Sequence, residues 1–191
     1  MRHGFEPPNE GAQVKAFFPA SAGGFFEFPK YVIDGFSYTI RPDMLMITFE
    51  QSDAKRLSNA ELIAARLLRT LSHTPITGVG HNFEFRDPQP SANYFNRFTE
   101  ATRDLLDQMP EGWSAGATTL SVSIKNKDGD VFCNIARTSD AGTIIVKFNF
   151  HHPVTSAEQA VKVLDGNGYS RMVDNLGLAQ TIIKGAYGNG D

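Results

Sequence analysis

The chain has 191 residues, a net charge of −3 and a single cysteine, Cys133. This length is typical of one domain that builds its core without disulfide or metal support. The slightly acidic balance argues against binding to duplex nucleic acid, and one cysteine excludes an intrachain disulfide. No segment has the pattern of a signal peptide or a membrane span, so we expect a soluble, cytoplasmic protein that does not bind membranes.

Residues 1–35 are rich in proline and glycine and also contain several phenylalanines. The first feature predicts an irregular N-terminal arm. The second indicates that the arm packs onto something, because disordered segments are usually poor in aromatic residues. Its target is either its own domain or a second copy of the chain, with residues 12–35 as the contact. We expect a single domain over residues 36–184 and a flexible tail over 185–191.

The first predicted elements are two strands, at 36–41 and 44–49, which a Pro-Asp turn joins into a hairpin. The pattern Ser58-Asn59-Ala60-Glu61 is typical of a capping box and predicts a helix over about 58–72. Residues 76–86 then alternate as in a strand and place His81 on an apolar face. A helical period over 91–109 predicts a second helix.

Three further strands are predicted at 117–125, 131–137 and 143–151, the first two joined at an Asp-Gly turn. In the strand at 117–125, the alternation predicts that Leu120, Val122 and Ile124 point inward. Two helices follow. The pattern Thr155-Ser156-Ala157-Glu158 is typical of a second capping box and predicts a helix to about Leu164, and a last helix is predicted over about 169–184. The element order predicts an α+β fold, a two-layer sandwich in which helices cover one face of a mostly antiparallel sheet of about five to six strands.

The candidate catalytic residues are histidines and neighbouring carboxylates. His81 is either a buried core histidine or a general base, and His151 is a second acid–base candidate. His151 and His152 point to opposite faces of a strand, so we expect no shared metal ion and no cofactor. The carboxylates that would assist the two candidate bases are Glu84 and Asp130.

The outward faces of the predicted strands carry small and polar side chains. If all helices pack on the phenylalanine-rich side, this face is left open, either as solvated surface or as a platform for a partner or a second subunit. The candidate binding residues are Ser121, Ser123, Asn134, Lys147, Asn149 and Asn82.

Two functions are consistent with these patterns. The first is a non-catalytic binding or interaction domain that self-associates as a homodimer, because no catalytic motif is present and the arm is aromatic. The alternative is a small enzyme, of hydrolase or isomerase type, that uses a histidine–carboxylate pair. A histidine and a carboxylate within hydrogen-bond reach in a pocket would favour the enzyme, and an open polar sheet face would favour the binding domain.

Overall fold

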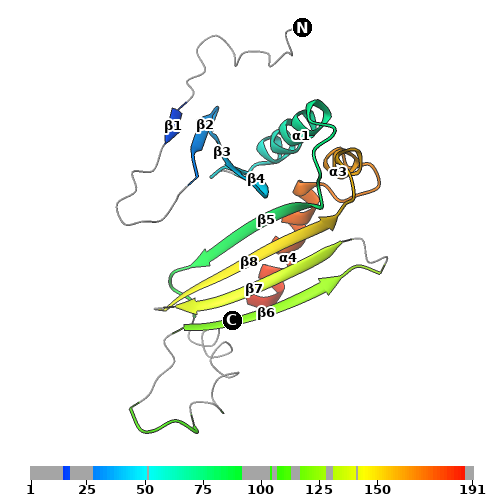
Figure 1. Cartoon of the computed structure of the whole chain (residues 1–191). Helices are drawn as coiled ribbons and strands as arrows, with labels where there is room; N and C mark the ends of the chain where they lie inside the picture. The colour runs from blue at the N-terminus through cyan, green and yellow to red at the C-terminus, as the bar shows by residue number, and fades with distance from the viewer. Residues whose placement is uncertain are drawn as a thin grey trace. The chain divides into compact units, whose positions relative to one another are not determined.

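The computed structural model describes residues 15–17, 28–50, 52–91, 104, 107–112, 117–127, 131–140 and 142–187. The chain divides into two compact units, Met1–Ala60 and Glu61–Asp191. Each unit contains one four-stranded antiparallel sheet (Figure 1). The α+β class and the antiparallel pairing are therefore confirmed, whereas a single sheet of five to six strands is wrong.

The first sheet begins within the segment for which we predicted an irregular arm. A two-residue turn at Asp34-Gly35, with φ angles of 50° and 78°, joins two of its strands, as is typical of tight hairpins. The described part of residues 12–35 is therefore partly regular, which corrects the prediction. The sheet runs in chain order through β1 (Lys15–Phe17), β2 (Lys30–Ile33), β3 (Phe36–Arg41) and β4 (Met44–Thr48).

Helix α1 (Ala54–Thr70) begins four residues before the predicted capping box. Its first turn is capped by Asp53, whose carboxylate accepts a hydrogen bond of 2.9 Å from the backbone N–H of Arg56. The box at Ser58 is therefore wrong. Glu61, its expected partner, is only 2% exposed and binds another part of the second unit. A serine and a glutamate at the right spacing thus occur one turn inside a helix whose cap is an aspartate.

The second sheet has the strand order β5-β8-β7-β6, and all neighbouring strands are antiparallel. Of the helix predicted over 91–109, the structure describes only residues 91, 104 and 107–109. The described elements after α1 are β5 (Gly78–Asp87), β6 (Ala117–Lys125), β7 (Phe132–Asp140), β8 (Thr143–Pro153), α3 (Ala157–Leu164) and α4 (Met172–Tyr187). The last helix thus continues into the predicted tail.

Helix α4 lies behind the second sheet in Figure 1 and covers one of its faces. The core lies between this helix and the two central strands, where Phe148 and Phe150 of β8 are almost fully buried. Strand β6 differs from the prediction, because Leu120, Val122 and Ile124 are 52%, 47% and 52% exposed. Apolar and polar side chains alternate along β6 as predicted. The apolar ones stay exposed because β6 is an edge strand and the described helices cover the centre of the sheet.

Helix α3 has a clear capping signal, one residue later than in the pattern Thr155–Glu158. Ser156 is the N-cap and accepts a hydrogen bond from the backbone N–H of Gln159. The Gln159 side chain accepts a hydrogen bond of 2.9 Å from the backbone N–H of Thr155. These reciprocal contacts fix the start of the helix directly after β8. None of the described helices is long and apolar enough to cross a membrane.

Candidate functional site

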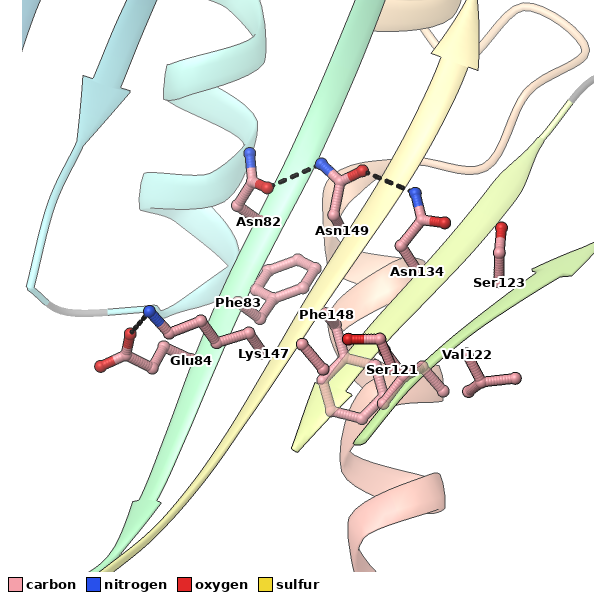
Figure 2. Close-up of a pocket in the computed structure, with 12 residues that line it drawn as sticks. Asn82, Phe83, Glu84, Ser121, Val122, Ser123, Asn134, Lys147, Phe148 and Asn149 are labelled. Carbon is pink, nitrogen blue, oxygen red and sulfur yellow. Dashed lines mark hydrogen bonds and ion pairs between the residues drawn. The ribbon is translucent and has the colours of Figure 1, made fainter. Parts of the chain in front are cut away.

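The face of the second sheet that points away from the core carries a row of three asparagines. The strand register aligns Asn82 of β5 with Asn149 of β8, Asn149 with Asn134 of β7, and Asn134 with Ser123 of β6. Directly opposed side chains in a sheet point to the same face. The row therefore crosses the whole sheet, and we call it the asparagine ladder (Figure 2).

Two hydrogen bonds connect the asparagine ladder. The Asn134 side-chain N–H donates to Oδ1 of Asn149 at 3.2 Å, and the Asn149 N–H donates to Oδ1 of Asn82 at 2.7 Å. Both bonds run in the same direction, so the ladder has an amide donor at its β5 end and a carbonyl acceptor at its β7 end. The three side chains hold one another in fixed positions on an open surface.

The next row of the same face is charged. Lys147 Nζ lies 3.3 Å from Glu84 Oε2, and Arg86 also donates to Glu84. The hydrogen bond from Arg86 is the main reason that the pKa of Glu84 lies below its usual value, and Lys147 lowers it further. One carboxylate thus serves two cations, so this end of the face has an excess of positive charge.

The two rows surround a hollow of about 570 Å³, a volume within the range of small-molecule binding sites. All six candidate binding residues line it, together with Glu84. Figure 2 shows the polar side chains of four strands arranged around this hollow. The residues that the structure brings together are Asn82, Ser121, Ser123, Asn134, Lys147 and Asn149.

Glycines on β5 leave space for the side chains of β8. A Cβ atom on Gly78 would lie 2.3 Å from Cε1 of His151, and one on Gly80 would lie 3.2 Å from Nδ2 of Asn149. A Cβ atom at position 78 would therefore require the His151 ring to move, and one at position 80 would press on the Asn149 amide of the asparagine ladder.

The three candidate catalytic residues that the structure describes, His81, Glu84 and His151, lie at separate places. His81 points into the core and Glu84 to the polar face, because they are three positions apart along β5 and side chains alternate between the two faces. His151 shares the polar face with Glu84, but the register puts them four residues apart along the strands, about 13 Å at 3.3 Å per residue. Asp130 lies outside the described residues. Among the described residues, neither His81 nor His151 is in contact with Glu84.

The buried face has a polar cluster of its own, centred on Glu61. Arg171 donates to the Glu61 carboxylate through Nε at 2.8 Å and lies 2.6 Å from it through Nη2. The backbone N–H of Met172, at the start of α4, donates to the other carboxylate oxygen at 2.7 Å. Glu61 thus connects α1 to the N-terminus of α4, where a negative charge is favoured.

His81 lies beside this cluster and is 2% exposed. The Asn175 side-chain N–H donates to Nδ1 of His81 at 2.9 Å, which leaves the ring proton on Nε2, 3.9 Å from Glu61. Burial lowers the pKa of His81 to about 4, and the nearby His152 and Arg171 add to this shift. His81 is therefore neutral at pH 7 and shielded from any substrate in solvent.

The sequence patterns did not identify Glu61, its partner Arg171, or Asn175, the partner of His81, as members of this cluster. Glu61 matched a local capping pattern, and the contacts that use it come from residues more than 100 positions away. Among the described residues, no group of three or more His, Cys, Asp or Glu side chains is placed to hold a metal ion. Comparison of the chain with protein-family models, curated proteins and solved structures gives no match.

Proposed function

We propose that this chain is a non-catalytic binding domain whose polar sheet face holds a small, carboxylate-bearing molecule. The observation that carries the proposal is the asparagine ladder beside Lys147, at the border of one hollow. A binding site needs polar groups that are held in place before the ligand arrives. The two hydrogen bonds of the ladder provide this order without using all of its hydrogen-bonding capacity.

The ladder leaves several amide donors available to a ligand. Each asparagine side chain has two N–H donors, and in the described part of the chain the ladder itself uses one from Asn134, one from Asn149 and none from Asn82. The hydroxyl groups of Ser121 and Ser123 can also donate. These donors can bind the acceptor atoms of a ligand.

The charges favour an anion for the same site. Lys147 and Arg86 are 61% and 65% exposed and share the single carboxylate of Glu84. A carboxylate group placed over Lys147 would form charge-assisted hydrogen bonds, which are stronger than neutral ones. An acceptor-rich ligand with a negative charge is thus complementary to both rows of the face.

Self-association belongs to the same proposal. The sequence suggested two surfaces for contact with a second copy, the open sheet face and residues 12–35. In our proposal the open sheet face binds the ligand, and part of residues 12–35 forms β1 and β2 of the first sheet. The homodimer therefore uses a third surface. A cytoplasmic location stays a prediction.

The alternative, an enzyme with a histidine–carboxylate pair, has weaker support. The only such pair that the described residues bring near each other is His81 and Glu61, at 3.9 Å. This distance exceeds a hydrogen bond, and both side chains are almost fully buried. Their contacts to Asn175, Arg171 and Met172 are those of a structural cluster.

Calorimetric titration of the full chain with succinate tests the proposal, with uncharged succinamide as the matched probe. We expect saturable binding of succinate and at least tenfold weaker binding of succinamide. The Lys147→Ala variant should bind succinate about tenfold more weakly, which corresponds to a loss of about 1.4 kcal/mol. Lys184→Ala, on the exposed side of α4, is the control and should bind like the natural chain.

Two results would contradict the proposal. One is the absence of saturable succinate binding by the natural chain. The other is an equal affinity in Lys147→Ala and Lys184→Ala, which would place the bound anion away from the polar face.

A further inference from the structure

The two outer strands of the second sheet differ in how their edges are protected. Figure 1 shows β5 at one edge and β6 at the other. Strand β5 contains two glycines, Gly78 and Gly80, and ends in charged residues. Proteins commonly use charges, prolines and irregularities to prevent a sheet edge from pairing with another strand. Strand β5 has such features.

Strand β6 has almost none of them. Its first eight residues, Ala117–Ile124, contain no charge, proline or glycine, and Lys125 is the only charged residue of the strand. The nine residues pair continuously with β7 without a bulge. Among the residues that the structure describes, no strand pairs with the outer edge of β6. This edge therefore presents a long, regular row of backbone donors and acceptors.

The side chains of β6 also favour pairing. Leu120, Val122 and Ile124 form an aliphatic strip on the core side of the sheet, and each is about half exposed. Alternating small polar residues, including Ser121 and Ser123, point to the polar face. A neighbouring strand would cover the aliphatic strip along its whole length. Removal of this apolar surface from water favours such an interface.

We propose that β6 pairs antiparallel with β6 of a second copy, so that the two second sheets join into one eight-stranded sheet. A two-fold axis perpendicular to the sheet and passing near Ser121 generates this pairing. The antiparallel ladder of one strand with itself is self-complementary, because each backbone donor meets an acceptor at the symmetry-related position. The β6 strand of a second copy can therefore pair with the outward-pointing backbone donors and acceptors at this edge.

The register that this axis imposes is favourable. Leu120 of one copy lies opposite Val122 of the other, so the aliphatic strips become continuous, and aliphatic cross-strand pairs stabilise sheets. Lys125 lies opposite Ala117, so the like charges are kept apart. The contact deepens the self-association part of the proposed function. It lies in the plane of the sheet, so it leaves the hollow on the polar face open in both copies.

Sedimentation and light scattering of the full chain test this dimer. We expect twice the mass of the 21.0 kDa chain for the natural protein. Leu120→Lys places two ammonium groups near the two-fold axis and should give a monomer. Leu178→Lys is the matched control, because Leu178 of α4 is 50% exposed against 52% for Leu120. This control should remain a dimer.

Hydrogen exchange of the natural protein tests the dimer even if the Leu120→Lys variant does not fold. Hydrogen exchange should be slow at every backbone amide of β6 when the chain is concentrated, and the amides that point outward should exchange at least tenfold faster on dilution below the dissociation constant. A monomer at all concentrations would overturn the proposal. A dimer that survives Leu120→Lys, with unprotected outward amides in β6, would also overturn it.

The two proposals fail separately. A folded, monomeric Leu120→Lys variant should bind succinate with the affinity of the natural chain, since Leu120 points away from the polar face. Loss of the dimer interface with retained succinate binding in this variant would support both proposals. A natural chain that is monomeric but binds succinate would overturn the dimer alone, and a dimer without succinate binding would overturn the ligand site alone.

Discussion

His81 and Asn82 are neighbours in β5, yet they belong to two polar regions with opposite properties. His81 joins the buried cluster of Glu61, Arg171 and Asn175, in which the polar groups mainly contact one another. Asn82 joins the asparagine ladder, in which several donors remain available to a ligand. The comparison teaches that polar character alone does not identify a site. Among the described residues, the asparagine ladder has unused hydrogen-bond donors at an accessible surface, whereas the buried cluster is not accessible to a ligand.

The largest effect should come from the buried cluster. Replacement of Glu61 by leucine leaves the guanidinium of Arg171 and the backbone N–H of Met172 without their acceptor. We expect the free energy of unfolding to fall by about 3 kcal/mol, as measured by urea denaturation, because two donors lose their acceptor, while the Arg171 side chain, 36% exposed, keeps part of its hydration.

Glu158→Leu is the control for that change. Glu158 also pairs with a cation, Lys162, but its side chain is 81% exposed. We expect a change within about 0.5 kcal/mol, because exposed ion pairs contribute little. Equal losses in the two variants would contradict a structural role that is special to Glu61.

The pH dependence of stability should report on the same cluster. The pKa of His81 is about 4 in the folded chain against 6.5 for an unperturbed histidine. The folded state therefore favours the neutral ring, so this contribution to stability is complete above pH 6.5 and is lost as the pH falls towards 4. The loss amounts to about 3 kcal/mol at 1.36 kcal/mol per pKa unit.

The His81→Gln variant isolates this contribution. Glutamine keeps an acceptor for the Asn175 amide but does not titrate. The free energy of unfolding, measured between pH 7 and pH 4.5, should fall less steeply in the variant than in the natural chain. Identical slopes would show that His81 does not resist protonation in the fold.

Two asparagines give the smallest and most selective contrast. Asn175 is 4% exposed and donates to His81, so Asn175→Ala should reduce the free energy of unfolding by about 1–3 kcal/mol by leaving a buried acceptor without its donor. Asn149→Ala, at the open face, should cost less than about 1 kcal/mol, because water replaces its contacts. Thermal unfolding of both variants at pH 7 measures the difference, and a larger loss in Asn149→Ala would reverse our assignment of the two regions.

The sequence predicted the faces of the central strands well but did not predict their assembly. Period-two alternation placed Phe148 inward and Asn149 outward, and all six candidate binding residues line one hollow. Alternation carries no information about strand order. It therefore predicted neither two separate sheets nor the edge position of β6, where Leu120 has half of its surface exposed.

The buried cluster could not be predicted from local sequence patterns either, because its contacts join residues that are far apart in the chain. Glu61 meets Arg171 through a contact between residues 110 positions apart, and a glutamate in a helix usually indicates a solvated face or a cap. The aspartate at position 53, directly before α1, was the correct capping signal. The Asp-Gly pair at 34–35 was likewise a signal for the hairpin between β2 and β3.

The most direct test of the central claim is a succinate titration of the natural chain, followed by the ¹H–¹⁵N resonances of the asparagine side chains. We predict saturable shifts of the amide resonances of Asn82, Asn134 and Asn149, with one common dissociation constant and no shift at Asn175. This result would place the anion on the polar face and leave the buried cluster untouched. Saturable shifts at Asn175 alone, or none at the asparagine ladder, would contradict the account.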